Sequence, residues 1–301
     1  MSDSAKIRVG VEICTASLRV VSIGADGKVA ENRTMPFDRD APKLSQLTDL
    51  IAVLKKDLGV FERLGIAVPG LVDPDSGRVA FSANFPEHSD IDLVKEIASA
   101  NGLAATIVND ANAAAYGEFI LGAGRGSNNF FYATLGEGVG GAFVFGGEIW
   151  RGASGFAGEF GYVPINSEGM RLEEVASTAN IIRRTRARFH QDNTSSLNKI
   201  AEEDITLEAI IAAARADDDF AQMMLERTGV YVGTAIASVI NLLNIEKIVV
   251  GGEIMAAKHL VLDAIIERAR ELSFAPSFIA AKIVEGELGE YAAATGAALL
   301  S

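Results

Sequence analysis

The chain has 301 residues, and 49% of them are hydrophobic, enough to bury the core of one large domain or two medium ones. Its formal net charge of −13 argues against a nucleic-acid partner, because binding a phosphate backbone needs clustered Lys and Arg. The single cysteine, Cys14, excludes an internal disulfide and a cysteine-based zinc site. With no signal-peptide pattern and no apolar run long enough to span a membrane, we expect a cytoplasmic protein without a membrane partner.

Apolar β runs near the amino terminus predict an antiparallel meander of strands. Helices and buried strands then alternate, because apolar residues recur at helical spacing in some segments and form short continuous runs in others. Ser89 and Asp90 are predicted to cap the second helix, and Gly102 to end it. The predicted strands cover residues 7–13, 18–23, 29–34, 64–68, 78–82 and 104–108, and the predicted helices cover residues 44–58 and 91–100.

The second half of the chain repeats this alternation. Two β runs flank the glycine-punctuated turn Leu-Gly-Glu-Gly-Val-Gly-Gly, and long apolar helices follow. The predicted helices cover residues 111–121, 173–187, 205–214, 220–244, 260–272 and 291–300, and the predicted strands cover residues 130–135, 141–149 and 247–250. This order of elements is typical of an α/β fold.

The stretch from residue 107 to residue 164 carries the chemistry. Asp110 follows a short apolar strand and precedes an Ala-rich helix, a position where open α/β sheets bind ligands. The glycine turn after it lets backbone N–H groups approach an anion, because no Cβ intervenes. Together these features suggest a proton acceptor and a phosphate cradle. The alternatives are an Asp that only caps the helix and a turn that is only a tight hairpin.

Several spaced motifs resemble the ROK family of sugar kinases and sugar-responsive repressors, within the actin-like and hexokinase-like ATPase clan. The resemblance implies an α/β, two-domain, actin-like ATPase (ribonuclease H-like) fold with a cleft between the domains. Residues 1–113 would form the sugar side, residues 114–288 the nucleotide side and the dimer surface, and residues 289–301 would pack back on the first domain. The matching motifs are Val68-Pro69-Gly70, Asn84 with Pro86, Asn109-Asp110-Ala111-Asn112, residues 135–141, Gly158-Glu159-Phe160-Gly161 and Gly251-Gly252.

By this resemblance Asp110 is the general base that accepts the proton of the attacking sugar hydroxyl. The sugar would be held by Gly70, Asn84, Asn109, Asp110, Glu159, Tyr162 and Glu173. Asn side chains suit this role since they donate and accept hydrogen bonds. Turn chemistry is the alternative for the two Asn residues, and a solvated charge on a helix face is the alternative for Glu173.

The resemblance also implies ATP with Mg²⁺ as cofactor. The nucleotide contacts would come from Glu12, Thr15, Gly136, Glu137, Gly138, Gly251 and Gly252. For the last two glycines a simple turn between strand and helix is the alternative.

The chain departs from the family pattern in three places. Glu12-Ile13-Cys14-Thr15-Ala16 stands where the family has Asp-x-Gly-Gly-Thr, and Glu137 stands where family kinases carry Thr or Ser. A carboxylate about 5 Å from a phosphate charge costs on the order of 3 kcal/mol at an effective dielectric of about 20. Tyr162 replaces the family histidine, and residues 166–171 contain no cysteine, so we predict no zinc and assign no metal-ligating residues.

Two functions fit these residues. The favoured one is an ATP-dependent, glucokinase-like transfer of phosphate to a hexose hydroxyl. The other is a sugar-binding sensor without phosphotransfer, related to the family's repressors. The phosphate loop with Glu137 resembles the loops of those repressors. We expect no N-terminal DNA-binding domain, because the first strand begins near Ile7. Under both functions the partners are a small-molecule sugar and a second copy of the chain in a homodimer.

Overall fold

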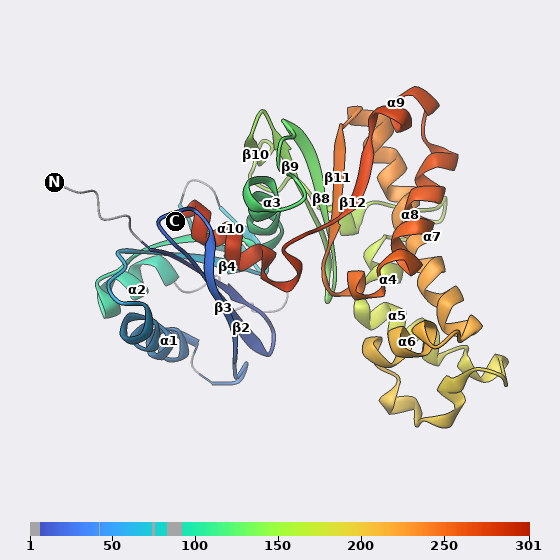
Figure 1. Cartoon of the computed structure of the whole chain (residues 1–301), viewed down its shortest axis with the longest axis horizontal. Helices are drawn as coiled ribbons and strands as arrows, with labels where there is room; N and C mark the ends of the chain where they lie inside the picture. Colours follow the sequence, from blue (N-terminus) through green and yellow to red (C-terminus); the bar gives the residue numbers. More distant parts are fainter. Residues whose placement is uncertain (1–6, 42, 74–75, 83–91) are drawn as a thin grey trace. The chain divides into compact units, whose positions relative to one another are not determined.

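The computed structural model describes residues 7–41, 43–73, 76–82 and 92–301 (Figure 1). Asn84, Pro86 and the predicted cap at Ser89 and Asp90 lie outside this part of the chain. The chain divides into two compact units. The first unit comprises Met1–Gly126, Ala142–Ala157 and Glu287–Ser301, and the second comprises Ser127–Gly141 and Gly158–Gly286.

The first unit is built around a five-stranded sheet, and the predicted antiparallel meander supplies three of its strands. Two further strands run parallel to the first strand of the meander. Across the sheet the order is β3 (Val29–Pro36), β2 (Ser17–Ile23), β1 (Arg8–Ile13), β4 (Arg63–Val68) and β7 (Ala104–Asn109). A short antiparallel pair, β5 (Leu71–Val72) and β6 (Val79–Phe81), follows β4.

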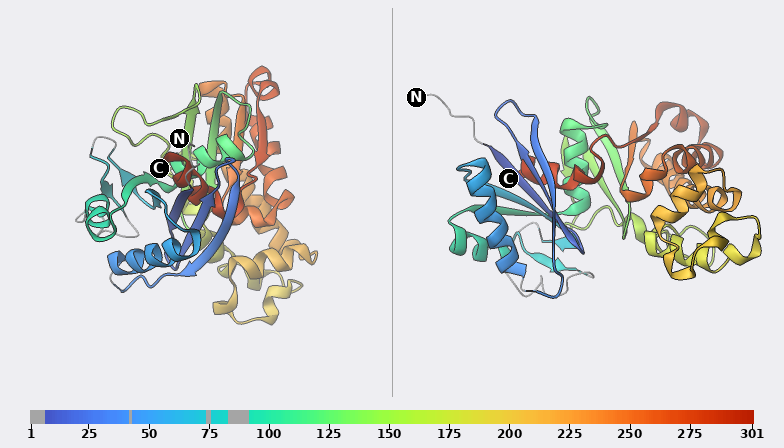
Figure 2. Two further views of the ribbon diagram at one scale, coloured as in Figure 1. Left: turned by 60° about the vertical axis from the view of Figure 1, so that its left-hand side comes forward. Right: turned by 60° about the horizontal axis from the view of Figure 1, so that its bottom comes forward.

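Helices cover both faces of this sheet (Figure 2). On one face, α1 (Lys43–Leu58) and α2 (Leu93–Asn101) pack on buried strand residues such as Val9 and Val11. On the other face lie α10 (Ala292–Leu300) and α3 (Asp110–Leu121). Gly10 and Gly65 are neighbours across β1 and β4, and a Cβ on either would lie within 2 Å of an α10 carbonyl oxygen. Only glycine therefore lets α10 approach the sheet this closely.

A second five-stranded sheet has three parallel strands and an antiparallel β9–β10 ribbon. Its order is β10 (Glu148–Trp150), β9 (Val139–Phe145), β8 (Asn129–Leu135), β11 (Lys247–Gly251) and β12 (Lys282–Glu285). The helices of the second unit are α4 (Glu173–Ala176), α5 (Thr178–Arg186), α6 (Leu207–Arg215), α7 (Asp219–Leu243), α8 (His259–Leu272) and α9 (Ala275–Ala280). Short 3₁₀ turns lie between them, among them η2 (Phe160–Tyr162) and η6 (Glu253–Ala257).

The long helix α7 packs closely against α8. At Gly229 and Gly233 of α7 an added Cβ would lie 2.6 Å from the carbonyl oxygens of Val261 and Ile265. This close packing accounts for the apolar surface that the sequence predicted for residues 220–244. In the described part of the chain no helix combines the length and the apolarity needed to cross a bilayer.

Two local predictions were wrong. Residues 173–187 do not form one helix, because Ser177 is extended with φ −73° and ψ 154° and separates α4 from α5. In a continuous helix the N–H of Thr178 would bind the carbonyl four residues earlier, but it donates to Gly136 O at 2.8 Å. Helix α2 begins at Leu93, and its N-cap is Asp92, whose side chain accepts from the N–H of Lys95 at 3.1 Å.

Candidate functional site

The carboxyl end of β7 carries the candidate site of the first unit. Asn109 ends the strand and Asp110 begins α3, so the polypeptide turns from strand to helix between them. Asn109 is the N-cap, since its Oδ1 accepts from the N–H of Asn112 at 2.9 Å. The alternative that Asp110 serves only as the cap is therefore wrong, and its carboxylate has a different set of partners.

Hydrogen bonds fix the orientation of that carboxylate. Oδ1 of Asp110 accepts from Asn109 Nδ2 at 3.0 Å and from the N–H of Ala111 at 2.8 Å. Asn109 Nδ2 also donates to Gly70 O at 2.9 Å, so both amide hydrogens of Asn109 are engaged. Gly70 has φ +132°, and a Cβ there would lie 2.4 Å from Phe81 O, so only glycine fits. Gly70 and Asn109 thus position Asp110.

A partly buried acid, Glu12, lies near Asp110 in the same unit. Glu12 pairs across the β1–β2 hairpin with Arg19, and Arg19 Nη1 lies 3.4 Å from Glu12 Oε2. Burial raises the pKa of Glu12 to about 7; the charge of Arg19 opposes this rise and the charge of Asp110 adds to it. Arg19 also lies 3.4 Å from Glu290. Sequence reasoning missed Arg19, although it and Glu12 are equally distant from the hairpin turn.

The turn of this hairpin carries Thr15, a predicted nucleotide contact. The N–H of Cys14 donates to Ser17 O at 2.9 Å and closes the turn. Thr15 is half-buried. The turn is thus formed without the two glycines of the family pattern.

The β8–β9 hairpin in the second unit is the predicted phosphate loop. The N–H of Gly136 donates to Gly138 O at 3.0 Å, and Glu137 and Gly138 are exposed at the tip. Glu173, the first residue of α4, accepts from the N–H of Val139 at 3.0 Å through Oε2. This bond rules out the alternative that Glu173 is a solvated helix-face charge, and it makes Glu173 a support of the hairpin.

A second support lies on the other side of the turn. Thr178, at the start of α5, donates its N–H to Gly136 O and its hydroxyl to Glu253 Oε1. A Cβ on Gly136 would meet Glu253 Cγ at 3.5 Å, so Glu253 lies close to the turn. Sequence reasoning missed Thr178 and Glu253, although Glu253 directly follows the glycine pair of β11.

That glycine pair is explained by packing. A Cβ on Gly251 would lie 2.2 Å from the hydroxyl of Tyr132, and a Cβ on Gly252 would lie 2.3 Å from Leu135 O. Gly252 also has φ +93°, which side chains rarely adopt. Both glycines are needed for the turn from β11 to η6, so the alternative of a strand–helix turn accounts for them without a ligand.

Glu159 is the N-cap residue of the 3₁₀ turn η2 in the second unit, and Tyr162 is the last residue of that turn. Burial first, and the nearby charge of Glu173 second, raise the pKa of Glu159. The Glu159 side chain makes no cap hydrogen bond to this turn. Tyr162 is 57% exposed and lies under the guanidinium of Arg171. Sequence reasoning did not single out Arg171.

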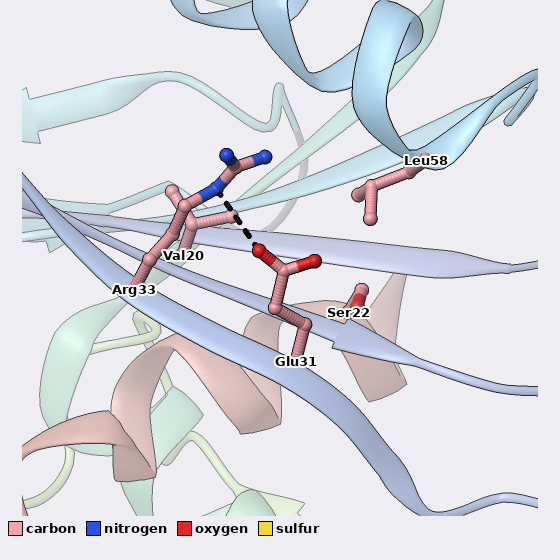
Figure 3. A pocket seen from close by; sticks show the side chains of 5 residues that line it. All are labelled: Val20, Ser22, Glu31, Arg33 and Leu58. Carbon is pink, nitrogen blue, oxygen red and sulfur yellow. Dashed lines mark ion pairs between the residues drawn. The ribbon is translucent and has the colours of Figure 1, made fainter.

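A surface recess elsewhere in the first unit does not qualify as a site (Figure 3). It is formed by β2, β3 and the end of α1, and Arg33 and Glu31 form an ion pair at its mouth at 3.6 Å. Its volume is about 130 Å³ including the solvent open to it, whereas small-molecule sites take about 300–1,000 Å³. Its lining residues are Val20, Ser22, Glu31, Arg33 and Leu58.

The sequence matches the ROK family over residues 8–301, and the chain belongs to this family. It is 31% identical over 307 residues to the glucokinase of Thermotoga maritima, which covers 96% of this chain and 95% of that protein. It is 24% identical to the xylose repressor of Bacillus subtilis, over 96% of this chain and 75% of the repressor.

Solved structures show the same fold. The ROK family glucokinase of Streptomyces griseus, crystallised with glucose and AMPPNP, superposes with a TM-score of 0.84 and 26% identity, over 98% of this chain and 99% of that one. The putative sugar kinase of Cytophaga hutchinsonii also gives a TM-score of 0.84, at 22% identity, over 98% of this chain and 99% of that one. The predicted α/β, actin-like ATPase fold is therefore confirmed.

Proposed function

We propose that this protein is an ATP-dependent sugar kinase that phosphorylates a hydroxyl of a hexose, with Asp110 as general base. The observation that carries the proposal is the carboxylate of Asp110, which lies at the carboxyl end of a parallel strand and is oriented through Oδ1 by Asn109 and Ala111. The glucokinase names of the two relatives support the same substrate class.

In this reaction the sugar hydroxyl oxygen attacks the γ-phosphorus of ATP, the bond to the β-phosphate oxygen breaks, and ADP leaves. The hydroxyl proton passes to the carboxylate of Asp110 as the new O–P bond forms. A carboxylate that is already oriented costs no reorganisation at this step. Asn109 has both amide hydrogens engaged, so its part is to orient Asp110.

ATP with Mg²⁺ fits the β8–β9 hairpin in this proposal. The tip of the hairpin is exposed, and Gly136 and Gly138 leave its backbone open to a phosphate. Mg²⁺ prefers carboxylate oxygens, which Glu137 and Glu253 supply at this turn. When bound, the ion neutralises charge on the phosphates. The nucleotide contacts predicted at Glu12 and Thr15 stay predictions.

Glu159 is the proposed sugar ligand of the second unit. Its side chain makes no cap hydrogen bond to η2, and a carboxylate accepts well from paired hydroxyls. Glu173, by contrast, uses one oxygen on the backbone of Val139, so its role is mainly to support the hairpin.

A second candidate function is a sugar sensor without phosphotransfer. The observation that favours it is the acidity of the nucleotide side: Glu137, Glu173 and Glu253 all lie at or against the turn of the hairpin. Each carboxylate opposes an approaching phosphate. The xylose repressor, which matches 96% of this chain, is a relative with a regulatory name.

The direct test is formation of a sugar phosphate. The purified protein is incubated with Mg-ATP and, one at a time, with glucose, mannose, fructose, N-acetylglucosamine and N-acetylmannosamine, and the products are read by mass spectrometry. The kinase proposal expects one phosphorylated sugar with a stoichiometric yield of ADP. Sugar binding by calorimetry without any phosphorylated product would favour the sensor.

A further inference from the structure

The segment after η2 folds into a short hairpin that closes through its own backbone. The N–H of Leu172 donates to Val163 O at 3.0 Å, and the N–H of Ile165 donates to Met170 O at 2.9 Å. Between these bonds, Pro164 and Arg171 form an antiparallel bridge. We name this segment, residues 163–172, the substrate-loop hairpin.

The tip of the substrate-loop hairpin is also closed by protein groups. Oδ1 of Asn166 accepts from the N–H of Met170 at 2.9 Å, and the backbone oxygen of Asn166 accepts from the N–H of Gly169. This side-chain bond to the backbone is the usual way in which Asn stabilises a turn.

Kinases of the family commonly hold a zinc ion at this place, and the residues here do not fit one. A structural zinc takes four Cys or His ligands in tetrahedral geometry. Between Tyr162 and Leu172 the chain has no Cys and no His, and Glu168 is its one carboxylate. The hairpin is instead closed by the bonds above.

Three further contacts connect Arg171 of the hairpin and Tyr162, which precedes it, to Glu159 and Glu174. The guanidinium carbon of Arg171 lies 4.5 Å from the centroid of the Tyr162 ring, in cation–π geometry. The N–H of Tyr162 donates to Glu159 O at 3.1 Å, and the N–H of Arg171 donates to Glu174 Oε2 at 3.0 Å. Glu174 lies next to Glu173 in α4.

We infer that the stack of Arg171 on Tyr162 takes the structural role of the family's zinc ion. The stack fixes the position of the turn that carries Glu159 relative to α4, and it thereby sets the affinity for the sugar. Arg171 is a positioning residue, because it acts through the loop that carries Glu159. The inference rests on the proposed sugar site, and the stack itself can be tested without it.

The test uses the full-length protein and three variants. Arg171→Ala removes the stack, and Arg171→Lys keeps the cation. The matched control is Arg270→Ala, which removes a guanidinium that lies 5.6 Å from the Phe278 ring. We expect R171A to raise the KM for the sugar roughly three- to tenfold with kcat within about twofold, and R171K to recover part of this loss. R270A should stay within about twofold of wild type.

Hydrogen exchange separates the stack from the function. Peptides that span residues 163–172 should exchange faster in R171A and unchanged in R270A, whether or not the protein phosphorylates a sugar. Metal analysis of the purified wild type should find less than about 0.1 zinc per chain. Stoichiometric zinc, or unchanged exchange in R171A, would contradict the structural role of the Arg171–Tyr162 stack. Faster exchange with an unchanged KM would contradict the link between this stack and sugar affinity. Loss of the proposed function is a different result, in which wild type neither binds nor phosphorylates a sugar.

Discussion

The strand end at Asp110 and the β8–β9 hairpin are built in opposite ways. At the strand end, neutral amides of Asn109 and Ala111 orient one carboxylate. At the hairpin, carboxylates of Glu173 and Glu253 support a glycine turn whose tip carries Glu137. The first arrangement favours proton transfer, whereas the second opposes a phosphate unless a cation is present. In the proposed kinase, activity would therefore depend more on whether the hairpin binds a nucleotide than on whether Asp110 is in place.

The largest expected effect is at Asp110. Asp110→Asn keeps the shape and removes the proton acceptor, so kcat should fall by about 10²- to 10⁴-fold while the Kd of the sugar changes little. The measurement is the rate of sugar phosphate formation together with calorimetric sugar binding. Asp49→Asn, at an exposed position of α1, is the matched control and should keep full activity. An active D110N protein would remove Asp110 from the mechanism.

Glu12 tests the environment of the strand end. Because burial raises its pKa to about 7, the folded protein holds this proton more tightly than the unfolded chain, whose Glu has a pKa near 4.5. The stability it contributes is complete below about pH 4.5 and is lost as the pH rises through about 7, by roughly 2 to 3 kcal/mol. Glu12→Gln removes this pH-dependent contribution to the free energy of unfolding.

Urea unfolding of both proteins at pH 5 and pH 8, without nucleotide, measures the difference. Wild type should lose about 2 to 3 kcal/mol relative to E12Q between the two pH values. Parallel behaviour of the two proteins would show that Glu12 titrates normally.

Glu137 tests the hairpin. Glu137→Thr removes one exposed charge from the tip and should tighten the binding of Mg-ATP about tenfold; the gain is smaller than the full Coulomb energy since water and salt screen the site. Calorimetric titration of a non-hydrolysable ATP analogue measures this. Glu148→Thr removes an exposed carboxylate from β10 and serves as the control. Equal affinities of E137T and wild type would show that Glu137 points away from the nucleotide.

Substitutions at Asn109 should give the smallest effect. They separate the two roles of its side chain, which caps α3 and orients Asp110. Asn109→Ala loses the N-cap and should destabilise the protein by about 1 kcal/mol. Asn109→Ser keeps a capping oxygen but loses both amide donors, so it should retain stability and still lower kcat. Thermal melting and activity of the two variants make the comparison. An N109S protein with full kcat would show that Asp110 needs no support from this amide.

Much of this architecture could be predicted from the sequence. The antiparallel meander, the end of α2 at Gly102 and the strand that leads to Asp110 all follow from local patterns, and the structure confirms them. The break between α4 and α5 could not be predicted, because it depends on a bond from Thr178 to Gly136, far away in the sequence. Nor could the cap be assigned, since Asn109 and Asp110 are both good N-cap residues.

One further contact could have been predicted from the sequence, one could not, and several predictions remain untested. The pairing of Glu12 with Arg19 was accessible from the register of the β1–β2 hairpin. The packing that requires Gly251 and Gly252 was not, because it involves the neighbouring strand β8. The homodimer, the cytoplasmic location, the identity of the sugar and the domain boundary at residue 113 stay predictions.

The central claim is that the acidic hairpin still accepts a nucleotide. Calorimetric titration of Mg-AMPPNP into the wild-type protein, with and without the sugar that gives product, tests it most directly. The account predicts nucleotide binding in the micromolar to low millimolar range that becomes tighter in the presence of the sugar. Sugar binding with no nucleotide binding at any Mg²⁺ concentration would contradict it and would leave the sensor as the function of this chain.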